Sequence, residues 1–150
     1  MLRMQIAFLG LVFVGCGSSM KSVEMKGSDQ DLMGLAGDWE GDYEVLGEGS
    51  RTGKIHFTLD SGRHTAKGEV LMYAEGSEDK PQPLNVSFVR AESGEVNGKL
   101  DPYLDPACQC QALTTFTGSR VGDVISGTFT VELVTLKMTR NGTWRVARKD

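Results

Sequence analysis

From Leu35 onward, the chain alternates apolar and polar side chains with a period of two residues, and this pattern constrains its fold more than any other feature. Between residues 38 and 45, for example, Trp39, Gly41, Tyr43 and Val45 alternate with acidic residues. Such alternation is expected of a strand with one buried face and one solvated face. Glycine supplies 19 of the 150 residues, and many glycines stand between the alternating segments, where tight turns are expected. The pattern predicts an all-β domain built from many short strands.

We expect about eight strands joined by short turns. The clearest turn signals are Asp60-Ser61-Gly62, Ser93-Gly94, Gly122-Asp123 and Asn141-Gly142. Asn141-Gly142 is the strongest hairpin signal among them, because both residues tolerate the positive φ of a type I′ turn. The predicted strands are residues 38–45, 54–59, 65–74, 84–88, 96–100, 110–119, 124–132 and 143–149. With no convincing helix between them, the fold class is a small antiparallel up-and-down β-barrel, since closure removes exposed strand edges.

A short apolar segment at the N-terminus is typical of an export signal. Arg3 gives a basic start, residues 6–14 are uncharged and nearly all apolar, and Gly15 directly precedes Cys16. The run is shorter than the ~18 to 20 residues that a helix needs to span a bilayer, which favours a signal peptide. Phe13-Val14-Gly15-Cys16 resembles the lipobox of bacterial lipoproteins. This resemblance implies cleavage before Cys16 and lipidation of its thiol, with an ordinary secretory signal or an uncleaved membrane helix as alternatives.

The lipoprotein resemblance also implies a location. Two or more acyl chains on Cys16 would hold the protein stably at a membrane. Gly17 occupies the place where an aspartate retains enteric lipoproteins at the inner membrane. We therefore expect a lipid-anchored protein of the cell envelope, at the outer membrane.

Three segments are expected along the chain: a signal peptide at 1–15, a lipidated N-terminus with a flexible linker at 16–32, and the barrel domain at 33–150. Residues 17–30 show neither an apolar period nor an apolar cluster, so they favour a linker. A short helix over 23–33 is the alternative, but Gly27 and Ser28 interrupt it. A linker of this length would span roughly 20 Å.

Charge and motifs exclude several function classes. The chain carries 16 basic and 20 acidic side chains and has no basic stripe, so we expect no nucleic-acid partner. Hydrolase, metalloprotease and nucleotide-binding motifs are absent from the sequence. Glu40, Asp42 and Glu44 alternate as on a solvated strand face, rather than forming an acid–base pair. We expect a protein that is not an enzyme and needs no cofactor.

Possible metal ligands are few. His56 and His64 fall on different predicted elements and match no common ligand spacing. Asp101 and Asp105 share a loop, which gives a faint indication of calcium, but each precedes a proline as in ordinary turns. No metal site is predicted.

Gly37-Asp38-Trp39 opens the first predicted strand, and Arg145 and Arg148 lie in the last one. These residues resemble the G-x-W opening of lipocalins and avidin-like barrels, where a tryptophan closes one end and a late basic residue packs over it. The resemblance covers the two ends of the chain, and the lipocalin T-D-Y motif is absent. It implies a barrel in which Arg145 or Arg148 packs over Trp39.

Cys108 and Cys110 are the thiols that remain once Cys16 is acylated. An oxidising compartment favours a disulfide between them, with free thiols, metal binding or redox catalysis as alternatives. Residues i and i+2 of an extended strand lie ~6.6 Å apart, near the upper limit for a disulfide. A local disulfide therefore requires a bend in the backbone between the two cysteines.

The aromatic residues on the apolar strand faces suggest where a ligand would bind. Trp39, Tyr43, Phe129 and Trp144 either fill the barrel or line a pocket for a small hydrophobic ligand, for which Gly41, Gly68 and Gly127 would leave room. We therefore expect a non-catalytic binding module. The alternative is an inhibitor or protein-interaction domain that contacts an envelope protein through the loops at 76–83 and 101–107.

Overall fold

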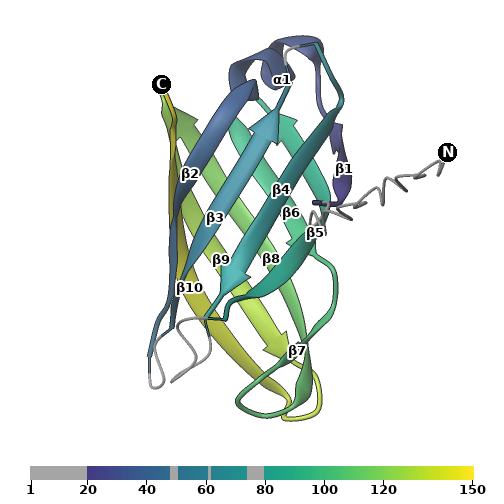
Figure 1. Cartoon of the computed structure of the whole chain (residues 1–150), viewed down its shortest axis with the longest axis vertical. Helices are drawn as coiled ribbons and strands as arrows, with labels where there is room; N and C mark the ends of the chain where they lie inside the picture. The colour runs from purple at the N-terminus through teal and green to yellow at the C-terminus, as the bar shows by residue number, and fades with distance from the viewer. Residues whose placement is uncertain (1–19, 48–50, 61, 74–79) are drawn as a thin grey trace, which may run out of the picture.

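The computed structural model describes residues 20–47, 51–60, 62–73 and 80–150 (Figure 1). The predicted signal peptide and Cys16 lie outside these residues. In the described part of the chain, ten strands form a single sheet with one short helix, α1 (Asp29–Leu35). The strands are β1 (Ser22–Lys26), β2 (Gly37–Val45), β3 (Thr52–Leu59), β4 (Thr65–Met72), β5 (Gln82–Glu92), β6 (Glu95–Leu100), β7 (Tyr103–Asp105), β8 (Cys110–Val121), β9 (Val124–Leu133) and β10 (Met138–Arg148).

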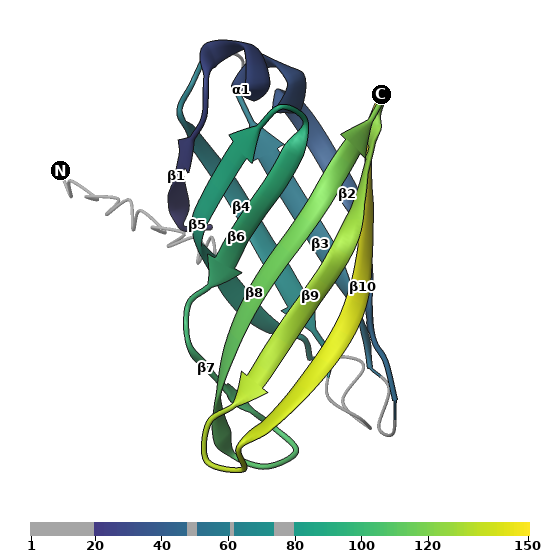
Figure 2. The ribbon, with the colours of Figure 1, turned by 180° about the vertical axis from the view of Figure 1, so that it is seen from behind.

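The sheet closes into a barrel. β2, β3, β4, β5, β6, β8, β9 and β10 follow one another around it as an antiparallel meander, and β10 returns to pair with β2 (Figures 1 and 2). The three-residue strand β7 pairs with the first three residues of β8, at the end that we call the lower end of the barrel. The helix α1 lies at the opposite, upper end. The predicted all-β barrel is confirmed, and its eight predicted strands correspond to the eight strands of this meander.

The flexible linker predicted for residues 16–32 is wrong where it meets the domain. β1 lies in the wall, antiparallel to β4 and parallel to β5, so the barrel has nine strands and is mixed. It fits there because β4 and β5 pair directly over only four residues each. Val23 and Met25 point inward and are 4% and 2% exposed. Their alternation extends over just five residues, too short a run to indicate a strand from sequence.

The helix α1 covers the upper end of the barrel. Ser28 caps its N-terminus by accepting a hydrogen bond from the backbone N–H of Asp31, and Leu32 and Leu35 are buried beneath it. The Trp39 indole is fully buried and donates a 2.8 Å hydrogen bond to the Leu35 carbonyl. Trp39 and α1 thus form one apolar plug. No helix within the described ranges has the length and apolar character needed to cross a bilayer.

The hairpin predicted at Asn141-Gly142 is wrong. The turn between β9 and β10 lies at residues 134–137, and Asn141 and Gly142 are in the middle of β10. Gly142 is required for another reason: a β-carbon at this position would lie 2.1 Å from the Phe129 ring. The other predicted turns have different outcomes. Ser93-Gly94 and Gly122-Asp123 are turns as expected, whereas Ser61 of the third lies outside the described residues.

Candidate functional site

The barrel interior is hollow between three clusters of buried side chains. The upper cluster surrounds Trp39, the lower one surrounds Tyr43 and Leu133, and a third joins Met72, Leu84 and Leu100. Six inward-facing side chains pack against two or more of these clusters yet remain only partly buried: Ile55, Val70, Val86, Tyr103, Phe116 and Trp144. Because these side chains project from the inner face, their exposed surface faces a cavity of about 150 Å³. The barrel interior is therefore hollow rather than filled by side chains.

Aromatic rings that lie over glycines shape the wall of this cavity. The Tyr43 ring covers Gly53, the Phe129 ring covers Gly142, and the Trp144 indole covers Gly118. A β-carbon at any of these three glycines would lie within 2.5 Å of the ring. The Trp144 N–H donates to the carbonyls of Thr117 and Thr128 at 3.0 and 3.3 Å, which fixes the indole against the wall. The absence of a side chain at Gly53, Gly118 and Gly142 thus makes room for these three rings.

Three of the four predicted ligand-binding residues line the cavity: Tyr43, Phe129 and Trp144. Tyr43 and Phe129 meet edge to face with centroids 5.7 Å apart, and Phe116 and Trp144 do so at 5.9 Å. Trp39 is not among the lining residues. It lies in the upper plug, with the guanidinium carbon of Arg148 4.4 Å from its ring centroid.

Of the three glycines expected to leave room for a ligand, one lines the cavity and two do not. Gly68 lines the cavity. At Gly41 and Gly127, the space that a side chain would take is occupied by the backbone of the neighbouring strand. These two glycines allow strands to approach closely and create no ligand space.

An ion pair lies at the lower end of the cavity. The Arg51 guanidinium donates three hydrogen bonds of 3.2 to 3.3 Å to the Asp105 carboxylate, which also accepts a 2.8 Å bond from the Ala107 N–H. The Arg51 and Asp105 side chains are 12% and 6% exposed, so the pair is shielded from water. It links the start of β3 to β7 and supplies charged groups to a mainly apolar pocket.

Two tyrosines lie beside this ion pair. Burial raises the pKa of Tyr43 well above its usual range, and the charges of Tyr103, Arg51 and Asp105 act on it in smaller amounts. Burial also raises the pKa of Tyr103, while its contact with the Thr114 hydroxyl at 3.3 Å and the nearby Arg51 and Arg140 oppose the rise. Both hydroxyls therefore stay protonated at neutral pH and are available as hydrogen-bond donors.

Arg51, Tyr103, Asp105 and Arg140 all line the cavity, and sequence reasoning placed none of them there; it named Asp105 only as a possible calcium ligand. Arg140 shares the inward face of β10 with Gly142, Trp144 and Val146. The alternation of inward and outward residues along β10 indicates this position. The turn wrongly predicted at Asn141-Gly142 placed Arg140 before the strand, so its inward orientation was not predicted. Arg51 and Asp105 precede β3 and end β7, where no long alternation marks a face.

The sulfur atoms of Cys108 and Cys110 lie at bonding distance, with the Cα atoms 5.1 Å apart. The bend that this separation requires is at Gln109, whose φ is +53°. The pair lies where β7 turns into β8, and Cys110 is buried in the lower cluster. The position of the pair indicates a local structural cross-link below the cavity.

Three of the side chains weighed as metal ligands have other partners. Asp101 accepts a 2.8 Å bond from Lys21, Asp105 pairs with Arg51, and His64 lies 3.2 Å from Asp29. Across the described ranges, no group of three or more histidine, cysteine or acidic side chains is placed to hold a metal ion.

Comparisons with known proteins find no match to this chain among family models, curated proteins or solved structures. A functional argument therefore depends on the chemistry of the cavity.

Proposed function

We propose that this protein is an envelope-anchored lipoprotein whose barrel is a non-catalytic binding module for a small hydrophobic ligand. The observation that carries the proposal is the apolar cavity of about 150 Å³, lined by Tyr43, Phe129 and Trp144. An apolar cavity of this size binds molecules such as benzene. Drug-sized ligands need ~300 Å³ or more, so the ligand, or the part of it that is buried, has about six carbon atoms.

The chain offers an internal reporter for this test. It contains two tryptophans, of which Trp144 lines the cavity and Trp39 lies in the upper plug. A ligand carrying bromine, such as 6-bromohexan-1-ol, would quench the fluorescence of a tryptophan that it contacts. We expect saturable quenching in the wild type and none in Trp144→Phe, which retains Trp39. Wild-type emission that does not change with added ligand would reject the binding function.

The anchor is proposed from the N-terminal sequence. Cys16 follows an apolar segment of signal-peptide length and a small residue, as in bacterial lipoproteins. β1 begins at Ser22, which leaves five residues between the lipidated cysteine and the barrel wall. At ~3.4 Å per residue these residues span at most about 20 Å, so the barrel would remain close to the lipid surface.

Localisation is tested separately from ligand binding. Expressed in a bacterial host, the wild-type chain should incorporate labelled palmitate and fractionate with the outer membrane. Cys16→Ala should lose the label and leave the membrane fraction. Cys108→Ala, which keeps Cys16, is the matched control and should remain lipidated. Membrane retention of an unlabelled Cys16→Ala protein would reject the lipid anchor.

A second candidate, a protein-interaction or inhibitor domain, is favoured by exposed apolar side chains at the lower end. Leu104 and Val134 lie on either side of Gln111: Leu104 is its register partner on β7, and the Val134 N–H donates to its carbonyl. Leu104 is 56% exposed, and Leu113 and Leu136 are also exposed. Loops on a rigid scaffold commonly carry recognition. If an envelope protein binds here, Leu104→Asp should abolish its capture without affecting quenching of Trp144.

A further inference from the structure

Arg140 places a positive charge at the lower end of the apolar cavity. Its register partner on β9 is Val131, which is buried on the inner face, and Arg140 itself is half-buried and lines the cavity. Two residues further along the same face of β10 is Gly142, followed by Trp144. A guanidinium at an inward position next to apolar surface is costly unless a negative charge or hydrogen-bond acceptor compensates it.

The two acidic residues that line the cavity, Glu69 and Asp105, do not supply that compensation. Asp105 is engaged by three hydrogen bonds from Arg51 and one from the Ala107 N–H. The Arg51 and Asp105 side chains neutralise each other. In residues 20–47, 51–60, 62–73 and 80–150, no carboxylate oxygen lies within 4.0 Å of the Arg140 guanidinium, and no acceptor is hydrogen-bonded to it. Arg140 therefore contributes a net positive charge to this end of the cavity.

Neutral hydrogen-bond donors accompany that charge. The Tyr43 hydroxyl makes no hydrogen bond to any described residue, although the Tyr43 ring is almost fully buried. Tyr103 lies close enough to Arg51 and Arg140 for both charges to act on its hydroxyl. A buried tyrosine hydroxyl usually has a partner, so the Tyr43 hydroxyl, which has none among the described residues, is free to donate to an acceptor brought by a ligand.

We propose that the ligand is a small amphiphilic anion: an apolar body of about six carbon atoms with one acidic group, whose negative charge pairs with Arg140. This inference depends on the proposed binding function and adds the chemical class of the ligand. Positions 140 and 144 are ~14 Å apart along β10 at ~3.4 Å per residue. A ligand with its acid at Arg140 therefore extends its apolar body up the cavity towards Trp144.

Matched probes test the inference. The acid 6-bromohexanoate and the alcohol 6-bromohexan-1-ol share a bromine-bearing chain and differ in the charge of the head group, and 6-bromohexan-1-amine carries the opposite charge. Quenching of Trp144 reports all three. At pH 7 and low salt, we expect the wild type to bind the acid roughly tenfold more tightly than the alcohol, and the amine least, because a hydrogen bond to a charged group is stronger than a neutral one.

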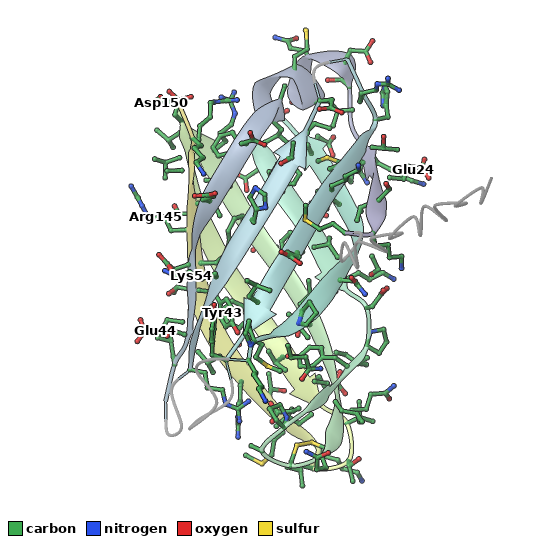
Figure 3. All side chains as sticks on the ribbon, viewed as in Figure 1. Glu24, Tyr43, Glu44, Lys54, Arg145 and Asp150 are labelled. Carbon is green, nitrogen blue, oxygen red and sulfur yellow. A yellow bond between two sulfur atoms is a disulfide. The ribbon has the colours of Figure 1, made fainter. Side chains whose placement is uncertain are left out.

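Two arginine variants identify the residue responsible. Arg140→Gln should weaken binding of the acid roughly tenfold and leave that of the alcohol within about twofold. Arg145→Gln removes the same charge from the same strand but from a side chain that projects away from the barrel (Figure 3), so it should change neither affinity. Binding of the alcohol by Arg140→Gln also shows that this variant is folded.

Each outcome has a distinct meaning. Equal affinities of the wild type for acid and alcohol would overturn the anionic ligand class without contradicting the proposed binding function. A preference for the acid that survives in Arg140→Gln would overturn the role of Arg140. Quenching by none of the three probes would reject the binding function itself, and the inference with it.

Discussion

Arg148 lies over the indole ring of Trp39, with its guanidinium carbon 4.4 Å from the ring centroid. The same guanidinium donates to the carbonyls of Gly34, at 3.0 Å, and Ala36, while its Nε donates to Asp123 at 2.8 Å. Gly34 and Ala36 lie at the end of α1, whose last carbonyls have no partner within the helix. One side chain at the end of β10 therefore fastens the helix, the plug tryptophan and the β8–β9 turn together.

Arg148→Ala should destabilise the barrel by about 2 to 4 kcal/mol, because it removes the cation–π contact and several charge-assisted hydrogen bonds. The free energy of unfolding in urea measures this loss. Arg145→Ala is the matched control on the outer face of β10 and should change the free energy by less than about 0.5 kcal/mol. Equal effects of the two substitutions would show that Arg148 does not fasten the upper end.

Gly142→Ala should be destabilising although alanine is a small residue. The new β-carbon would lie 2.1 Å from the Phe129 ring and 2.4 Å from the Glu44 carbonyl oxygen. Relieving that overlap should cost about 1 to 3 kcal/mol, measured by urea denaturation. At Gly68 a β-carbon would lie no closer than 3.3 Å to its nearest neighbouring atom, so Gly68→Ala serves as the control and should cost distinctly less. The reverse order would contradict the ring-over-glycine packing.

The barrel could be predicted from sequence because alternation over many residues fixes which side chains turn inward. In β2 the alternation predicts Trp39, Tyr43 and Val45 as buried, and all three are. β1 escaped prediction because its five residues hold just two inward apolar side chains, Val23 and Met25. Its place between β4 and β5 is a tertiary choice that local pattern does not encode.

The functional site was predictable only in part. The inward faces supply Tyr43, Phe129 and Trp144 as candidate ligand contacts. Whether such side chains meet or leave a void depends on how the three buried clusters fit together, and sequence alternation carries no information about volume. Asn141-Gly142 shows a further limit. The dipeptide suits a turn, but in the structure it lies within β10, where the Phe129 ring leaves no room for a side chain at position 142.

The burial of the two cavity tyrosines should make the free energy of unfolding fall at high pH. In the unfolded chain, tyrosine ionises near pH ~10, whereas burial raises the pKa of Tyr43 and of Tyr103 in the native state. Above pH ~10 the unfolded chain therefore loses protons that the native state keeps, and stability falls as pH rises. The contribution is fully present at lower pH.

Tyr43→Phe isolates one of these two groups. The Tyr43 hydroxyl has no hydrogen-bond partner among the described residues, so the variant should be close to wild type at pH 7. Between pH 10 and 11 it should lose less stability than the wild type, by at most about 1.4 kcal/mol per pH unit. Urea denaturation across this range provides the comparison. Parallel pH profiles for the two proteins would mean that Tyr43 ionises as in water.

Breaking the Cys108–Cys110 link should affect stability modestly. A cross-link that closes so small a loop removes little entropy from the unfolded chain, roughly 1 to 2 kcal/mol. Cys108→Ser should therefore cost about that amount in urea denaturation. Cys110→Ser should cost more, because Cys110 is buried in the lower cluster and its hydroxyl would lie among apolar neighbours. If Cys108→Ser matched the wild type under oxidising conditions, the link would contribute nothing to the native state.

Filling the cavity should separate its role in binding from its role in folding. Val70 projects inward from β4 and is partly exposed to the cavity, whereas its neighbour Leu71 faces the outside of the barrel. Val70→Phe places a ring in empty space, so it should abolish quenching of Trp144 by 6-bromohexan-1-ol while leaving the free energy of unfolding within about 1 kcal/mol of the wild type. Leu71→Phe adds a ring of the same kind to the outer face and should preserve quenching. Undiminished quenching in a folded Val70→Phe protein would mean that the probe binds outside the cavity, since the added ring and the ligand would compete for the same volume.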